Sequence, residues 1–67
     1  MTVARVTEIN SSSEKSFEDA CAKGIERATE TLKNVRGAWV ESQKLVVKDG
    51  KISEYRVNMR VTFVLKD

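Results

Sequence analysis

The sequence predicts a small α+β domain whose elements follow the order strand, helix, strand, strand. Three observations predict it. Residues 13–34 carry one apolar stripe at helical spacing, an Asp-Gly pair at 49–50 separates two runs rich in β-branched residues, and residues 52–65 alternate between apolar and polar. With 67 residues, the chain has room for one domain, which we take as 1–67.

Residues 3–9 are rich in β-branched side chains and predict a short first strand. The run of Asn and Ser at 10–13 should end this strand, because such side chains compete for backbone hydrogen bonds. The same hydroxyls suit a helix N-cap. Ser11 and Glu14 have the spacing of a capping box, and either of the next two serines is an alternative cap.

The helix is predicted over residues 13–34. Gly24 lies within its apolar stripe, where glycine is about 0.5–1 kcal/mol less stable than alanine. We therefore expect another backbone to approach the helix at this point. The apolar positions follow the spacing of one helix face and are Phe17, Ala20, Cys21, Gly24, Ile25, Ala28 and Leu32.

The helix should end before Gly37, and residues 38–47 predict a second strand. Asp49-Gly50 is typical of a tight hairpin turn in which both central residues have positive φ. Residues 52–65 predict a third strand. Whether the first strand pairs parallel to a later one, with the helix as crossover, stays open from these residues. One face of the third strand carries Tyr55, Val57, Met59, Val61, Phe63 and Leu65.

The opposite face of the third strand, with Arg56, Asn58 and Arg60, has nothing left in the chain to cover it. A core of this size supplies about 3–5 kcal/mol of stability. Cys21 is the single cysteine and there is no histidine, so neither a disulfide nor a structural zinc can add to it. We therefore expect the chain to pack against copies of itself.

Composition excludes several function classes. A net charge of +2, with both signs mixed along the chain, does not predict nucleic-acid binding. No apolar run approaches the roughly 18 residues that predict a membrane span. The unpaired cysteine and the lack of an export signal predict a cytoplasmic protein. Because the usual general base, histidine, is missing, we do not expect an enzyme.

Four stretches together resemble a known family: SSSEKSF at 11–17, TLKNV at 31–35, AWVESQ at 38–43 and YRVNMRVTFVL at 55–65. In order, spacing and total length they resemble the dodecin family, over essentially the whole chain. The resemblance implies a β-α-β-β protomer whose antiparallel-type, bent, three-stranded sheet wraps around one amphipathic helix. It also implies a hollow homododecamer with helices outside and sheets inside.

Many dodecins bind riboflavin or FMN and store these flavins without turning them over. The resemblance implies that an aromatic residue, usually Trp, stacks on the flavin ring from the start of the second strand, and that a Gln follows the aromatic residue of the third strand. Here Gly37 and Arg56 occupy those two positions. Trp39 shares the strand face of Gly37 and would shift the stacking platform by roughly 6.5 Å. The candidate cofactor-binding residues are Gly37, Trp39, Gln43, Arg56 and Asn58.

Two of these residues have a second interpretation. Trp39 is either the platform for the ligand or an anchor in a subunit interface, where tryptophan is enriched. Arg56 and Arg60 form either a small anion site or ion pairs with Glu41 or Glu54 across subunits.

Calcium is the alternative ligand, because some dodecins that lack the stacking Trp are associated with calcium. The carboxylates of this chain do not have the spacing of a calcium loop, so symmetry would have to gather them around an axis. Individual metal ligands are therefore not assigned. The scattered carboxylates are Glu8, Asp19, Glu41 and Asp49.

Overall fold

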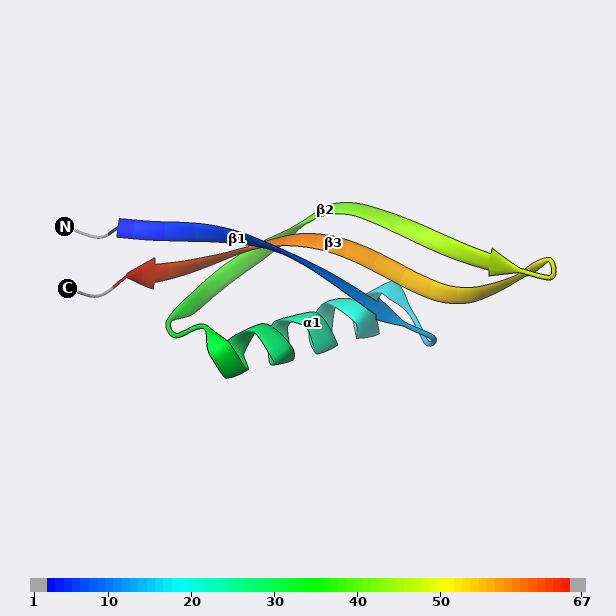
Figure 1. Ribbon diagram of the computed structural model, residues 1–67, viewed down its shortest axis with the longest axis horizontal. Helices are drawn as coiled ribbons and strands as arrows, with labels where there is room; N and C mark the ends of the chain where they lie inside the picture. The colour runs from blue at the N-terminus through cyan, green and yellow to red at the C-terminus, as the bar shows by residue number, and fades with distance from the viewer. Residues whose placement is uncertain (1–2, 66–67) are drawn as a thin grey trace.

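The computed structural model describes residues 3–65, which form β1 (Val3–Ser13), α1 (Phe17–Thr31), β2 (Val35–Lys48) and β3 (Lys51–Leu65). The strands make one antiparallel sheet with β3 in the centre, between β1 and β2. The helix lies across one face of this curved sheet (Figure 1). The predicted fold class is confirmed. Since β1 is antiparallel to β3, the helix is not a parallel crossover.

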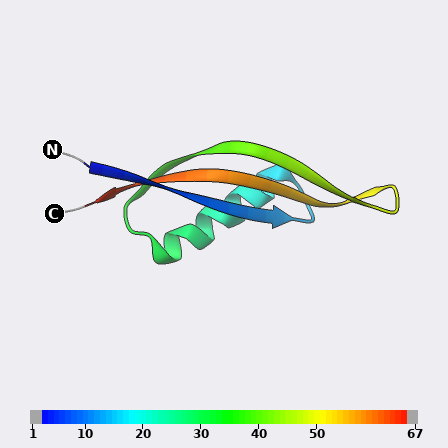
Figure 2. The ribbon, with the colours of Figure 1, turned by 45° about the horizontal axis from the view of Figure 1, so that its top comes forward.

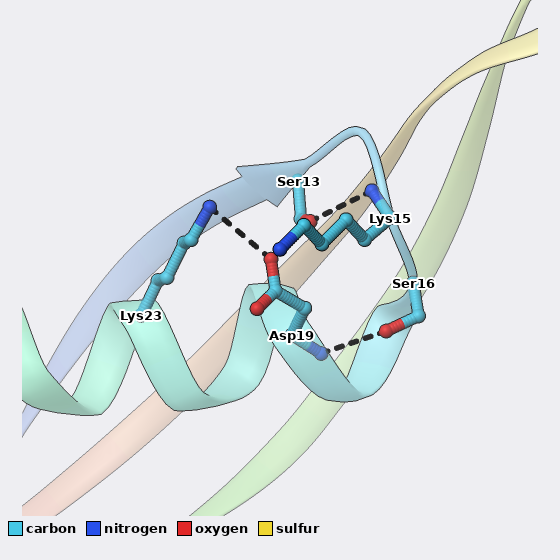
Figure 3. Close-up of polar contacts among 5 residues, drawn as sticks. All are labelled: Ser13, Lys15, Ser16, Asp19 and Lys23. Carbon is cyan, nitrogen blue, oxygen red and sulfur yellow. Dashed lines mark hydrogen bonds and ion pairs between the residues drawn. The ribbon is translucent and has the colours of Figure 1, made fainter.

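The first strand is longer than predicted, because β1 continues through the three serines. The expectation that these serines end the strand and cap the helix is wrong. The cap is Ser16, whose hydroxyl accepts the backbone N–H of Asp19 at 2.9 Å. Buried Ser13 accepts the N–H of Lys15 at 2.9 Å and donates to the Asp19 carboxylate (Figure 3). Its hydroxyl therefore fixes the corner between β1 and α1.

The helix packs on β1 and β3 through small residues, and Ala20, Gly24 and Ala28 are buried. A Cβ built on Gly24 would lie 2.6 Å from Met59 Cε and 3.0 Å from Ser11 Cβ. The prediction of a close approach at Gly24 is therefore confirmed. Side chains of β1 and β3 make this approach, whereas we expected a backbone. On β3 the predicted apolar face is the buried one, with Val57, Met59 and Val61 at its centre.

Residues with positive φ turn the chain at two places. Asn34 has φ 61°, and its carbonyl accepts the N–H of Val64 at 3.1 Å. The chain therefore turns at Asn34, and β2 begins before Gly37, earlier than predicted. Asp49 and Gly50 have φ 53° and 74°, which confirms the predicted tight turn between β2 and β3.

The hairpin of β2 and β3 extends well past the rest of the molecule (Figures 1 and 2). Pairing with β1 ends where Ser13 meets Tyr55, so residues 46–54 form a two-stranded segment, here called the arm. The molecule measures 52 × 19 × 13 Å as a result. In the part of the chain that the structure describes, no helix is long and apolar enough to cross a membrane.

Candidate ligand-binding site

The sheet face opposite α1 is uncovered and is called here the open face. Residues that pair directly across antiparallel strands lie on the same face. The register therefore places four cross-strand rows on the open face, each with one residue from β1, β3 and β2. The outermost is Val6–Thr62–Gly37. The next three are called here the first, middle and third rows: Glu8–Arg60–Trp39, Asn10–Asn58–Ser42 and Ser12–Arg56–Lys44.

In the first row the indole of Trp39 lies beside Arg60, whose positive charge is neutralised by a carboxylate. Trp39 is 48 % exposed, although it is the largest apolar side chain of the molecule. Its partner Arg60 contacts Glu41 through Nε at 2.7 Å and also pairs across the sheet with Glu8. The ion pair that we expected between subunits is thus made within one chain. Trp39 remains available to a flat ligand or to a second copy.

The third row is basic, because Lys44 lies directly opposite Arg56. Arg56 contacts Glu54 through Nε, but at 3.4 Å and with half of its side chain exposed. Like charges placed directly across a sheet repel each other. This end of the open face therefore favours a negatively charged group.

The middle row is polar and forms the floor of a hollow. The Oδ1 atom of Asn58 is buried and has no hydrogen-bond partner among the described residues. Asn10 and Ser42 lie on either side of Asn58 in the register. The hollow has a volume of about 410 Å³ and is lined by Asn10, Ser11, Ser12, Ser42, Lys44, Arg56, Val57 and Asn58.

A separate polar cluster holds the start of α1 (Figure 3). The hydrogen bond from Ser13 is the main cause that holds the pKa of Asp19 below its ordinary value. A contact of 3.2 Å with the Lys23 ammonium acts in the same direction, while desolvation opposes both. A carboxylate with a lowered pKa is a weak base. The cluster therefore fits a structural role at the helix start rather than a catalytic one.

Within residues 3–65, no group of three or more His, Cys, Asp or Glu side chains comes together to hold a metal ion. The four carboxylates considered for calcium lie apart. Asp19 serves the start of α1, and Asp49 lies in the hairpin turn. Glu8 and Glu41 approach each other only through Arg60.

Four of the five predicted cofactor-binding residues share the open face: Gly37, Trp39, Arg56 and Asn58. Gln43 does not, because it pairs with Val57, which faces the helix side. The cause is a bulge. Glu41 has no partner in the register, so the alternation of β2 reverses after Trp39 and Gln43 points away from the residues predicted to accompany it.

Sequence reasoning missed Asn10, Ser12, Ser42 and Lys44, which line the hollow. The polar run at 10–13 was interpreted as a strand end and helix cap, so its open-face positions were not considered. Lys44 shows its relation to Arg56 only through the cross-strand register. The register is set by three shifts in the β2–β3 ladder, which the alternation of the sequence does not reveal.

The Dodecin family model matches residues 3–66. The chain belongs to the dodecin family. Dodecins are small-ligand binders rather than enzymes, and they form homo-oligomers. The order β1, α1, β2, β3 and the three-stranded antiparallel sheet are those of the dodecin fold.

Relatives of two kinds are similar to this dodecin chain. The calcium dodecin of Mycobacterium tuberculosis is 34% identical over 67 residues, which cover 98% of this chain and 93% of the relative. A crystal structure of that calcium-chelating protein, described as having a novel calcium-binding site, matches with a TM-score of 0.83. The dodecin from Streptomyces davaonensis matches with a TM-score of 0.95 and 33% identity, over 98% of this chain and 97% of its own.

Proposed function

We propose that this dodecin assembles into a hollow homododecamer in the cytoplasm and holds a flavin, riboflavin or FMN, between open faces of neighbouring copies. It acts as a store and does no chemistry on the ligand. The observation that carries the proposal is the half-exposed indole of Trp39 on the uncovered face of the sheet, in a row next to polar side chains.

The shape of the single chain supports assembly. Its Cα radius of gyration is 13.8 Å, whereas a compact chain of this length has about 11 Å. An isolated two-stranded hairpin is marginally stable in water, yet the arm projects without support from β1. Among residues 3–65, large apolar side chains are exposed at eight positions: Val3, Val6, Trp39, Val40, Leu45, Val47, Ile52 and Leu65. Copies of the chain would cover them.

The open face supports a flat, polar-edged ligand. Stacking on an aromatic face contributes about 0.5–1.5 kcal/mol beyond the burial of area, and Trp39 offers such a face. Arg56 and Asn58 lie on the same side of the sheet and supply hydrogen-bond donors and an amide. A flavin has both parts, a planar ring system and carbonyl and imide groups at its edge.

The test is a titration of the purified protein with riboflavin and FMN, followed by quenching of flavin fluorescence, with the native mass measured on the same sample. We expect saturable quenching at the mass of twelve chains. Trp39→Ala should weaken binding, Trp39→Phe should retain part of it, and Lys51→Gln at the hairpin turn is the control. If the fluorescence of neither riboflavin nor FMN is quenched at micromolar protein concentration, flavin binding is refuted.

Two variants test the shifted platform directly. Gly37 stands where the resemblance places the stacking Trp, and a Cβ there would meet only Thr62 Oγ1, at an ordinary 3.5 Å. The backbone at Gly37 therefore has room for a Cβ, and Gly37→Trp should tighten flavin binding by about tenfold. Arg56→Gln should add the amide that both donates and accepts. Neither gain is expected if the flavin lies elsewhere.

Calcium is the second candidate, favoured by the 34% identical calcium dodecin. Glu8 and Glu41 are the carboxylates of the open face that lie beside Arg60, and Glu54 lies on the same face beside Arg56. A calcium site would need further oxygen ligands from other copies. Calorimetric titration with calcium after treatment with a chelator tests it. Glu41→Gln should abolish the heat of binding, and Glu26→Gln on the exposed side of α1 should not.

A further inference from the structure

Most of the exposed apolar side chains lie on the same face of the sheet as α1, which is called here the helix face. Cross-strand partners lie on one face, so the buried residues of β3 identify it. Val40 pairs with buried Met59, and Leu45 pairs with Tyr55, whose ring contacts Phe17 of α1. By this register the exposed apolar residues of the helix face are Val3, Val40, Leu45, Val47, Ile52 and Leu65.

The helix does not cover these residues because it lies toward one edge of the sheet. It packs on β1 and β3 rather than on β2. The flank of α1 that is turned to the edge strand β1 is polar, since Lys23 and Arg27 line a hollow there together with Ile9 and Ser11. The helix face of β2 is therefore left without a cover from its own chain.

The opposite flank of α1 is turned toward β2 and is apolar. The helical spacing places Cys21 and Ile25 on this flank, and both side chains are half-buried. With Val40 and Leu45 of β2 they form one apolar surface, which is called here the shoulder. An exposed apolar surface of this kind is typical of an interface with another protein.

The arm has an apolar surface of its own. Its helix face carries Val47 and Ile52, which pair with each other and are 62 % and 49 % exposed. The arm extends beyond the start of α1, away from the shoulder (Figure 1). Because the arm and the shoulder lie on the same face of one sheet, they cannot cover each other within a chain. The arm of one copy and the shoulder of another can meet face to face.

We infer that the arm of one copy packs Val47 and Ile52 on the shoulder of a second copy. The inference rests on the proposed function, in which copies also meet through their open faces. A contact between two open faces uses the same surface on both sides and therefore links only two chains. A larger homo-oligomer requires a second contact made by other residues. The arm and the shoulder supply that contact on the opposite face of the sheet.

Disulfide formation tests the contact, because Cys21 is the single cysteine of the chain and lies in the shoulder. Within one chain, Val47 lies roughly 6.5 Å outward from the Phe17–Tyr55 contact. Cys21 lies about 5.4 Å from the same contact in the other direction, one helical turn inward (Figure 1). Since a disulfide spans only about 4.4–6.8 Å between Cα atoms, a link between positions 47 and 21 joins two chains.

The experiment oxidises Val47→Cys and Ile52→Cys in the assembled protein and measures the mass without reductant. We expect covalently joined chains, with mass spectrometry of the peptides identifying Cys21 as the partner. Lys48→Cys, on the other face of the arm, is the matched control and should not link to Cys21. Adding Cys21→Ser to Val47→Cys should abolish the product. The inference is overturned if neither arm cysteine links to Cys21, or if Lys48→Cys links to it equally well.

A charge in the shoulder tests the contact in a second way. Val40→Asp should reduce the native mass to that of two chains, which the open faces still join. Ala22→Asp, on the exposed side of α1, should leave the mass unchanged. Circular dichroism confirms that both variants fold. Retention of the wild-type mass by Val40→Asp would overturn the inference.

Flavin titrations on the same samples separate this inference from the proposed function. A wild-type mass of one or two chains overturns the arm contact together with the homododecamer. A mass of twelve chains without any link between the arm and Cys21 overturns the arm contact alone. Linked chains that quench neither riboflavin nor FMN support the arm contact and overturn flavin storage.

Discussion

The guanidinium of Arg60 lies 2.7 Å from the carboxylate of Glu41, the residue that β2 carries in excess at its central register shift. The extra residue brings a carboxylate to the open face and moves Gln43 off it. The ion pair and the bulge are thus two effects of one inserted residue, and they can be tested separately.

Removing the Glu41 charge and removing the residue should both cost little. Both side chains of the ion pair are nearly half exposed, so Glu41→Gln should lower the free energy of unfolding by less than about 1 kcal/mol. The neighbours of Glu41, Val40 and Ser42, already pair with consecutive residues of β3, so deleting Glu41 should remove the bulge and leave every other residue on its present face. We expect the deletion variant to unfold cooperatively in urea. Loss of cooperative unfolding in that variant would contradict the assignment of Glu41 as the extra residue.

Asp19 should make stability depend on pH in the acid range. Its hydrogen bond with Ser13 and its contact with Lys23 hold the pKa of the folded state below the ordinary value near 3.9. A depressed pKa stabilises the fold above the unfolded value, and this contribution is lost as pH falls through the folded pKa.

Asp19→Asn should therefore flatten the stability profile below about pH 4. The measurement is the urea midpoint between pH 7 and pH 2.5 at one protein concentration, with Glu26→Gln as the control. An unchanged slope in Asp19→Asn would show that the carboxylate has no such role.

Gly24→Ala should destabilise the fold despite the better helix propensity of alanine. The new methyl would lie 3.0 Å from Ser11 Cβ, and the cost of overpacking is about 1–3 kcal/mol. The gain from propensity is only about 0.5–1 kcal/mol. Ala22→Gly, at an exposed position of α1, measures propensity alone.

A double-mutant cycle locates the clash. Ser11→Gly removes the Cβ that faces Gly24, so it should recover part of the loss when combined with Gly24→Ala. Chemical denaturation of the four proteins gives the coupling energy. A more stable Gly24→Ala protein, or zero coupling, would show that β1 yields to the methyl at no cost.

The arm should depend on neighbouring copies. Val47 is 62 % exposed in the single chain, and a surface substitution there would change stability by less than about 0.5 kcal/mol if the chain stood alone. We expect Val47→Asp to reduce the native mass and the melting temperature, while Lys48→Asp, next to it at the turn, leaves the mass unchanged. Equal masses for both variants would indicate that no copy covers Val47.

Features governed by local periodicity could be predicted from the sequence. The alternation around Val57, Met59 and Val61 identified the buried face of β3, and Asp49-Gly50 identified the turn. The prediction that the serines at 11–13 end the strand was wrong, because tertiary contacts override local propensity. Ser13 stays in the strand since its hydroxyl has partners in Lys15 and Asp19.

The open face was predicted only in part, because its composition depends on cross-strand register. A hairpin counted back from the turn without shifts would pair Gln43 with Arg56, whereas the register pairs Lys44 with Arg56. Local sequence carries no marker for the shift at Ser53 that causes this difference. The shift at Glu41 cancels it, so beyond Glu41 the unshifted count again gives the observed partners, Arg60 for Trp39 and Thr62 for Gly37.

Val3 and Leu65 are cross-strand partners at one end of the molecule, and the tight turn at Asp49-Gly50 lies at the other. A short glycine-serine bridge between these neighbouring ends, combined with a cut at the turn, would give a circularly permuted protein with every ladder intact. In such a protein new peptide segments could be attached at the former turn, about 50 Å away from the bridge.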